Sequence, residues 1–392
     1  MVIRKYRSNS LFANEFLISF LLVFCYFFNN GNYNLFWIYG VLLAFKSLLT
    51  NPNIHSRAII WIIPIFLMSC FSLLCTDINF SLEKNIVAMA KIYLCFVIMF
   101  FFADYANTIN YGKLIKWLFI LTSILLVIAI TVKPARLWSL GDTVNIYYSD
   151  RLRLFCIEPS QLGFLVGIIL TFLFMAFMAQ HWNIKLLAIT GIFAITLFLA
   201  MPMGAIMSLA VSCAYILANQ LASSTKKKGI RFGTFFIFIL FVCAVIYILI
   251  SDNTIIARLT DMINGRDGSY NTRINLCLRT LPILMEKTHY MGVGLGNINT
   301  SDVLSITRYI YSNSYLDFLG STGVWAIPYL VLLYRMFIRK MENDKVLKIA
   351  LLLYLIVYQI PGGYFTDPII WIIYGYIMSD ASIFSTSNEV EV

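Results

Sequence analysis

The sequence predicts an all-α, polytopic integral membrane protein with about 12 transmembrane helices and two extracytoplasmic loops, residues 133–158 and 251–312. Three observations support this class. The chain of 392 residues is 60% hydrophobic and 12% charged, with a mean hydropathy of +0.81, which leaves too few polar residues to cover a soluble globule. The apolar residues fall in long runs. The basic residues lie mostly between those runs.

The apolar runs define the expected helices. A membrane span needs about 20 apolar residues, and the last two runs are shorter than this. Proline and glycine mark tight turns at 201–204 and 361–363. The expected spans lie near 11–28, 34–50, 58–75, 85–106, 114–132, 159–180, 184–200, 204–222, 232–250, 313–337, 347–360 and 368–380.

The basic residues predict the orientation, because short cytoplasmic loops carry an excess of Lys and Arg. An even number of spans places both termini on one side of the membrane. That side would hold nearly all the basic residues of the short loops, whereas the opposite short loops hold only Lys84. We therefore expect both termini in the cytoplasm, one transmembrane domain over residues 1–380, and a short cytoplasmic tail over 381–392.

Composition and motifs also exclude some classes of function. Topology accounts for the net charge of +10, so nucleic acid is not an expected partner. The three histidines form no cluster and no metal-binding motif is present, so neither a metal nor a cofactor is expected. Of the eight cysteines, only Cys156 and Cys277 lie in the long polar loops, where a bridge could form in an oxidising compartment.

The first long loop ends in a group of charged residues. Arg151 and Arg153 could clamp phosphate oxygens in pairs of hydrogen bonds. Glu158 precedes Pro159 at the expected start of a helix, where its carboxylate could act as a general base. The alternative is structural: Glu158 would complement the helix dipole, and the arginines would contact lipid headgroups.

The second long loop contains an expected interfacial helix and a glycine turn. Residues 271–282 are predicted to form an amphipathic helix at the membrane surface, from which Arg273 and Arg279 could each bind a phosphate or simply extend to the interface. Gly292, Gly294 and Gly296 do not fit a dinucleotide-binding loop. They predict a turn with positive φ that returns the chain to the membrane.

Two expected spans carry further polar candidates. Asn313, Tyr315 and Asp317 open the tenth span, and a carboxyl group there is either functional or a hydrogen-bonded structural group. The sixth and tenth spans both begin outside, so their helix N-termini could converge on an anion. Lys91 lies about 9 Å below the outer end of the fourth span and could line the same cavity or extend towards the interface.

These segments, in this order, resemble the O-antigen polymerase and ligase superfamily of membrane glycosyltransferases, of the GT-C type. The resemblance covers Arg151 to about Gly323 and the surrounding helices. It is carried by the stretch from Arg151 to Pro159, by Arg273 in an Arg-x-x-x-x-x-Arg stretch, by the turn from Gly292 to Asn297, and by Asn313-Ser-Tyr-Leu with Gly320 and Gly323 following.

The resemblance implies a bacterial cytoplasmic (inner) membrane enzyme that joins oligosaccharide repeat units linked to undecaprenyl pyrophosphate. Arg151, Arg153, Arg273 and Arg279 would hold the pyrophosphate, and Glu158 or Asp317 would accept a proton. Donor and acceptor glycolipids and membrane lipid would be its partners, with a chain-length regulator and a flippase as further candidates. Ligases usually have His before the Asn of this stretch. Ser312 at that position favours polymerase.

Two alternatives remain open at this point. An O-antigen ligase shares the resemblance and differs in the acceptor. A flippase or transporter of lipid-linked glycans belongs to another class. Such carriers often have helices broken by Gly or Pro near the membrane midplane.

Overall fold

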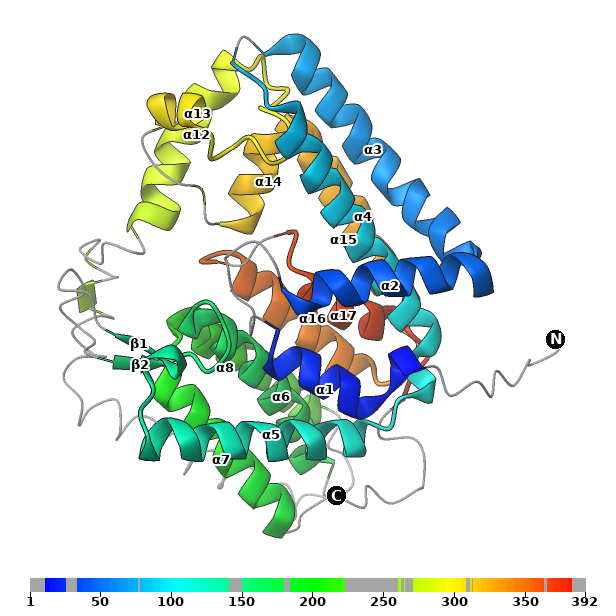
Figure 1. Ribbon diagram of the computed structural model, residues 1–392, viewed down its shortest axis with the longest axis vertical. Helices are drawn as coiled ribbons and strands as arrows, with labels where there is room; N and C mark the ends of the chain where they lie inside the picture. Colours follow the sequence, from blue (N-terminus) through cyan, green and yellow to red (C-terminus); the bar gives the residue numbers. More distant parts are fainter. Residues whose placement is uncertain are drawn as a thin grey trace.

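The computed structural model describes residues 11–25, 34–76, 78–140, 150–179, 184–222, 260–261, 264, 271–307, 311, 313–362 and 365–382, and these are almost entirely helical (Figure 1). The first half contains α1 to α8 and one short antiparallel hairpin, in which Ser139 pairs with Arg151. Their bounds are α1 Glu15–Val23, α2 Leu35–Thr50, α3 Asn53–Cys75, α4 Leu82–Tyr105, α5 Tyr111–Thr131, β1 Trp138–Leu140, β2 Asp150–Leu152, α6 Pro159–Met178, α7 Ile184–Ala200 and α8 Met203–Ala222.

The second half begins with a short π-helical segment at Asn271–Leu276. The helices that follow are α12 Cys277–Lys287, α13 Ser301–Thr307, α14 Ser314–Thr322, α15 Ala326–Lys340, α16 Lys345–Gln359 and α17 Pro368–Met378. A one-turn 3-10 segment at Gly323–Trp325 joins α14 to α15.

Six helical stretches of the described chain are long and apolar enough to cross a membrane, which confirms an all-α membrane protein. The predicted count of twelve is not confirmed. Helix α1 has nine residues and α17 has eleven, and a crossing needs about 20, while the expected span 232–250 lies outside the described residues. The six stretches are Asn53–Cys75, Leu82–Thr108, Tyr111–Thr131, Pro159–Met178, Met203–Ala222 and Ser314–Lys340.

Side-chain caps define where several of these helices begin. Asn14, Asn34 and Asn110 each accept a hydrogen bond from the backbone N–H three residues later, at 3.0 to 3.1 Å. Ser81 caps α4 in the same way at 3.3 Å. Each cap satisfies an N–H group that the helix itself leaves without a partner, so the start of the helix is encoded locally.

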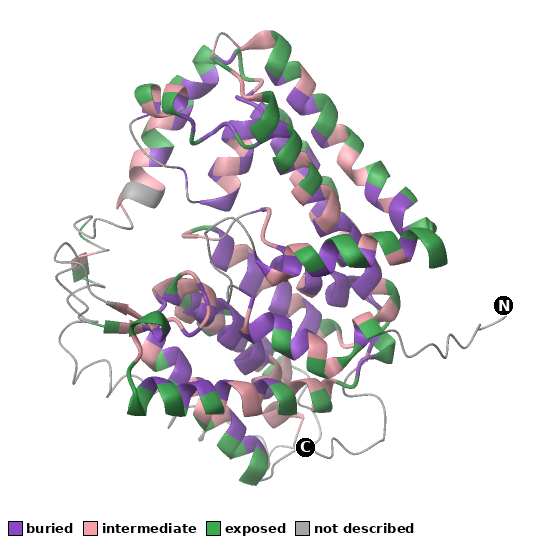
Figure 2. Ribbon diagram, in the orientation of Figure 1, coloured by how far each residue is buried: buried purple, intermediate pink, exposed green. Residues whose placement is uncertain are grey.

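The outer faces of the helices are apolar and exposed. Figure 2 shows exposed residues along α2, α3 and α5, and among them Phe45, Ile60 and Leu74 are 67%, 64% and 78% exposed. A soluble protein rarely leaves so continuous an apolar surface uncovered. Lipid is the environment that these faces fit.

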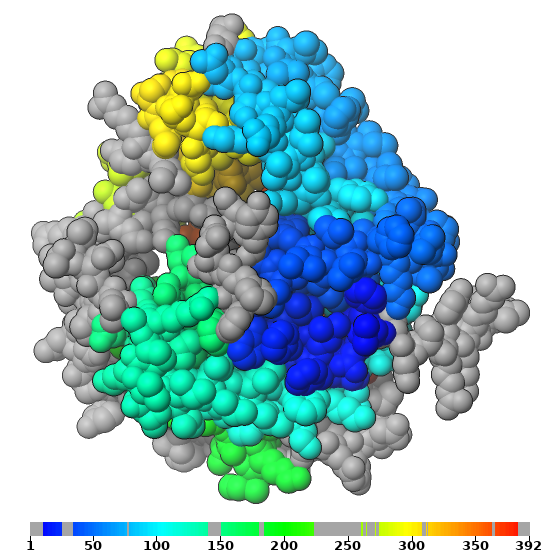
Figure 3. All heavy atoms as spheres, in the orientation of Figure 1, coloured from blue at the N-terminus to red at the C-terminus, as the bar shows by residue number. Residues whose placement is uncertain are grey.

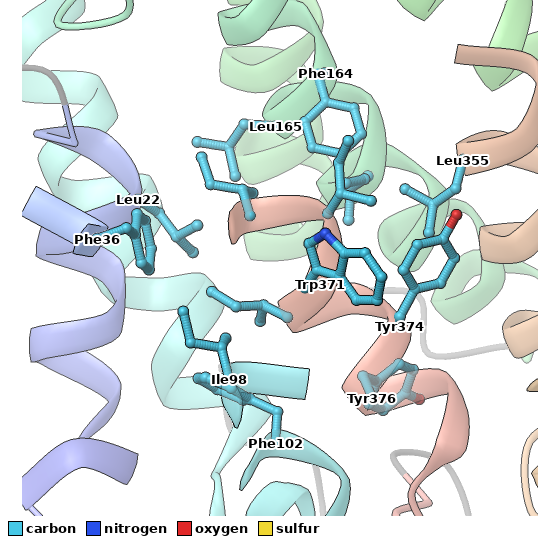
Figure 4. Packing of buried hydrophobic residues seen from close by; sticks show 14 of the residues in the cluster. Leu22, Phe36, Ile98, Phe102, Phe164, Leu165, Leu355, Trp371, Tyr374 and Tyr376 are labelled. Carbon is cyan, nitrogen blue, oxygen red and sulfur yellow. The ribbon is translucent and has the colours of Figure 1, made fainter. Parts of the chain in front are cut away.

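The core centres on Trp371 of α17, which is fully buried between α4, α6 and α16 (Figure 4). Its ring meets the edge of Phe96 at a centroid distance of 4.6 Å, and its indole N–H donates to the Phe365 carbonyl oxygen at 2.8 Å. A buried indole needs such a partner. The short helix α17 is therefore enclosed by protein on several sides.

Hydrogen bonds between distant segment ends fall into two groups. One group joins ends that the sequence places outside: Arg151 to Met201, Asn313 to Ile360, Ser72 to Met291, and Ser81 to Asn297. The other joins ends placed in the cytoplasm: Arg57 to Asp104, Glu15 to Asn110, Asn343 to Asp380, and Lys348 to Ser379. None of these eight bonds joins an end of one group to an end of the other, and the orientation of the segments across a membrane stays a prediction.

Candidate functional site

The turn between α16 and α17, residues 360–367 with 363 and 364 outside the described chain, runs along α14. Asn313 donates its side-chain N–H to the Ile360 carbonyl oxygen, and the Ser314 hydroxyl donates to the Gly362 carbonyl oxygen at 3.4 Å. The rings of Phe318 and Phe365 stack at 4.5 Å. The start of α14 is therefore held against the end of α16.

The start of α6 reaches the same end of α16. The Tyr358 hydroxyl donates to the Ser160 carbonyl oxygen at 3.2 Å, and the Tyr354 hydroxyl donates to the Phe164 carbonyl oxygen at 3.1 Å. The N-termini of α6 and α14 therefore both lie at the C-terminal end of α16. The sequence predicted that these two helix starts could converge. The start of α6 contacts Tyr358 and the start of α14 contacts Ile360, two residues later.

Arg151 is held by the backbone of another helix. Its Nε and Nη2 atoms donate to the carbonyl oxygens of Ala200 and Met201 at 3.0 and 2.9 Å. These carbonyls end α7, where the helix dipole is negative and a cation is favoured. The guanidinium thus has a structural role that the sequence did not reveal, because the carbonyls lie 49 and 50 residues further along the chain.

Arg153 and Glu158 are less enclosed. The Nε of Arg153 donates to the Arg136 carbonyl oxygen at 3.1 Å, which ties the two sides of the first loop together. Glu158 is exposed at the N-cap of α6 and accepts a hydrogen bond from the Ser160 hydroxyl at 3.0 Å. Its carboxylate therefore lies at the positive end of the helix and is open to a ligand from outside.

Asp317 lies in the first turn of α14, partly buried, with the Ser321 hydroxyl 3.5 Å from one carboxylate oxygen. Asn313 precedes it as the helix cap, accepting from the N–H groups of Tyr315 and Leu316 at 3.0 and 3.1 Å. All the polar atoms of the Asn313 side chain thus serve the fold. The Asp317 carboxylate accepts one long side-chain hydrogen bond, from Ser321, and is the more available group.

Tyr315 belongs to a buried set of hydroxyls. Its hydroxyl is 2.8 Å from that of Tyr334, and the hydroxyls of Tyr334 and Tyr374 both donate to the Gln359 side-chain oxygen at 3.3 Å. The side-chain nitrogen of Gln359 is buried without a hydrogen-bond partner. This network joins α14, α15, α16 and α17, so Tyr315 acts here in packing.

The two arginines of the second loop differ in what the structure describes. Arg279 is exposed on α12, whose buried face consists of Cys277, Leu281, Leu284 and Met285. The helix is amphipathic, as predicted, but Leu278 lies on its exposed face. Arg273 lies in the π-helical segment before α12, and its side chain is outside the described part of the structure.

Lys91 lies on α4, one turn before Cys95, whose thiol contacts the Thr366 carbonyl oxygen in the turn between α16 and α17. Its Nζ is 5.7 Å from the centre of the Trp37 ring, on the neighbouring helix α2. A cation over an aromatic face is stabilised by the ring quadrupole. This contact gives Lys91 a partner within the bundle.

The glycine turn adopts the predicted conformation and docks onto α3 and α4. Gly292, Gly294 and Gly296 have φ of +77°, +78° and +76°. The Asn85 side chain donates to the Leu295 carbonyl oxygen at 3.2 Å, and the Ser72 hydroxyl donates to the Met291 carbonyl oxygen at 2.5 Å. Polar side chains on two membrane helices thus satisfy the irregular backbone of this turn.

The end of the second loop is anchored by Tyr311. Its side chain is fully buried, its hydroxyl is 2.8 Å from the Thr280 hydroxyl, and its N–H donates to the Asn299 side-chain oxygen at 2.9 Å. Burial raises the pKa of Tyr311 to about 12, so it remains a neutral hydroxyl. In Figure 3 the segment that includes α12 and α13, coloured yellow, lies directly against the light-blue residues of α3 and α4.

Asp367 is a candidate that the sequence analysis missed. It caps α17 by accepting from the Ile369 N–H at 3.1 Å, and the carbonyl oxygen of the preceding residue, Thr366, accepts from the Cys95 thiol at 3.7 Å. The signal was present in the sequence, since Asp367-Pro368 repeats the arrangement of Glu158-Pro159: an acidic residue, then proline at the first helical position.

Within the described ranges, no three His, Cys, Asp or Glu side chains group as metal ligands would. Compared with known proteins, the chain matches no family model and no curated protein.

Proposed function

We propose that this chain polymerises oligosaccharide repeat units linked to undecaprenyl pyrophosphate, on the outer face of a bacterial cytoplasmic membrane. The observation that supports this most is the meeting of the α6 and α14 starts at the end of α16, through Tyr358–Ser160 and Asn313–Ile360. Glu158, two residues before Ser160, and Asp317, one turn after Asn313, come from segments far apart in the sequence and both lie near these contacts.

The proposed reaction transfers a glycan between two lipid carriers. An acceptor sugar hydroxyl attacks the anomeric carbon of the donor, the bond from that carbon to the pyrophosphate oxygen breaks, and the hydroxyl proton passes to Glu158 or Asp317. Charge develops on the leaving pyrophosphate, and the guanidinium groups of Arg153, Arg273 and Arg279 stabilise it. Arg151 contributes chiefly by holding the α7–α8 turn, because two of its N–H groups already bind carbonyl oxygens.

The outward location of this end rests on the basic residues. The segment ends that contact one another here hold few lysines and arginines outside the two long loops, and the opposite ends hold most of them. Lipid-linked repeat units would then be reached from the outer leaflet.

Isosteric substitutions test the proposal. Glu158→Gln and Asp317→Asn remove one negative charge each and keep the shape, so we expect at least one of them to abolish long surface polysaccharide at normal protein abundance. Arg279→Ala should shorten the chains. Arg339→Ala is the matched control, because Arg339 is equally exposed on α15 at the opposite end of the bundle.

The readout is a gel ladder of surface polysaccharide from cells carrying each variant. Full ladders from Glu158→Gln, Asp317→Asn and Arg279→Ala would refute the proposal. Single repeat units attached to the final acceptor are expected from loss of a polymerase, whereas unattached polymer would indicate a ligase. Purified protein that lengthens lipid-linked repeats in detergent, without a gradient, would exclude a carrier.

A further inference from the structure

Two cysteines that lie far apart in the sequence belong to segments that contact each other at the proposed outer end of the bundle. Cys25 lies two residues after the end of α1, and Cys156 lies three residues before α6. The segments that carry them are in contact one residue earlier in each, at Phe24 and Phe155. Both are free thiols in the structure, and both are buried, at 1% and 7% exposure.

The contacts around each cysteine fix the position of its backbone. The rings of Phe24 and Phe155, the residues just before each cysteine, stack at a centroid distance of 5.1 Å and an interplanar angle of 29°. The Cys25 carbonyl oxygen accepts from the Leu35 N–H at 2.8 Å, and the Cys156 N–H donates to the Arg153 carbonyl oxygen at 2.9 Å. Both backbones are therefore fixed on either side of the sulfur atoms.

This pair differs from the bridge between Cys156 and Cys277 that the sequence suggested. Cys277 packs into the buried face of α12 with Leu281 and Leu284, in a cluster that does not include Cys156. The first apolar run, 11–28, includes Cys25 and predicts a position inside a membrane span. Helix α1 ends at Val23, however, which leaves Cys25 beyond the helix.

We propose that Cys25 and Cys156 form a disulfide bond in the mature protein. Disulfides persist in oxidising compartments, and the basic residues place these two segments outside the cytoplasm. The oxidant is the disulfide of an extracytoplasmic oxidoreductase or of a small oxidised thiol. One cysteine thiolate attacks that disulfide and releases one thiol, and the second cysteine attacks the mixed disulfide and releases the other.

The reaction transfers two electrons from the cysteine pair to the oxidant, and the two cysteine protons are balanced by the two thiols released. Because both sulfurs are buried in the folded protein, the exchange takes place while α1 and the first loop are still assembling. The finished bond would tie the segment after α1 to the entry of α6, two residues before Glu158. It does not depend on the proposed glycosyl transfer, so the two proposals can fail separately.

Counting reactive thiols in the full-length protein tests the bond. Membranes are quenched in acid, and the protein is dissolved in denaturant and labelled with a polyethylene-glycol maleimide, before or after reduction. The chain has eight cysteines, so one bond leaves 8 − 2 = 6 adducts without reductant and eight with it. Eight adducts in both samples would overturn the proposal.

Single variants identify the pair. Cys25→Ser and Cys156→Ser should each give seven adducts with and without reductant, because the remaining partner becomes free. Cys277→Ser is the matched control and should give five adducts before reduction and seven after it. A loss of the reduction-dependent difference in Cys277→Ser, with its retention in Cys25→Ser, would assign the bond to another pair and refute the one proposed.

Discussion

The side-chain N–H of Asn313 donates to the carbonyl oxygen of Ile360, while the side-chain oxygen of the same residue caps α14 through the N–H groups of Tyr315 and Leu316. One buried amide therefore starts a helix and fastens it to the end of α16. The candidate carboxylate Asp317 lies one turn further along that helix and takes its position from this contact.

Asn313→Ala should destabilise the protein more than the loss of a cap alone. A lost cap costs about 1 kcal/mol, and a buried carbonyl left without its partner adds about 1–3 kcal/mol. Asn110→Ala is the control, since Asn110 caps α5 at an exposed site. Thermal unfolding in detergent measures both. Equal losses of stability in the two variants would contradict the structural role of the Ile360 contact.

Arg151→Ala should lower stability, whereas Arg279→Ala should not. Hydrogen bonds from a charged donor contribute about 1.5–3 kcal/mol each, and Arg151 makes two to the end of α7. Arg279 is exposed on α12. Arg151→Lys keeps the charge but not the two-pronged geometry, so its stability should fall between wild type and Arg151→Ala. An unchanged unfolding midpoint in Arg151→Ala would show that these bonds contribute little.

Gly294→Ala should damage the fold. An added Cβ would lie 2.0 Å from a ring carbon of Phe80, and φ of +78° disfavours any residue with a side chain. Overpacking and the strained backbone together cost about 2–5 kcal/mol. Gly191→Ala is the matched control, because nothing lies within 4 Å of its Cβ, and alanine in a helix stabilises by up to about 1 kcal/mol. Gly294→Ala should lower both the abundance of the protein in membranes and its unfolding midpoint, whereas Gly191→Ala should raise both.

Asn85→Leu should loosen the glycine turn while the bundle persists. The substitution removes the donor to the Leu295 carbonyl oxygen and the contact with Ser69, both at 3.2 Å. Hydrogen exchange at the amides of residues 294–297 should accelerate about fivefold or more, since one buried bond contributes about 1–3 kcal/mol. Ser123→Ala is the control: its hydroxyl oxygen is buried without a partner, so its loss should leave exchange unchanged. Equal exchange in Asn85→Leu and wild type would contradict the docking role of Asn85.

The sequence alone determined the membrane class, the position of most helices and the glycine turn. These are local properties: hydropathy depends on composition along one segment, and positive φ at Gly292 and Gly294 depends on one residue at a time. Asn34 and Asn110 likewise specify where helices begin from bonds to neighbouring residues. Each of these features can be predicted from one short segment of the sequence.

Only the tertiary structure decided which polar groups meet. Arg151 donates to carbonyls 49 and 50 residues away, and Asn313 donates to a carbonyl 47 residues away. The segment of Cys156 packs against that of Cys25, and Cys277 lies in a different cluster. Such pairings depend on how helices pack, because a side chain that could bind phosphate, lipid or backbone has the same sequence signature in each case. Packing also gave short helices such as α17 their buried position, which the length of an apolar run does not encode.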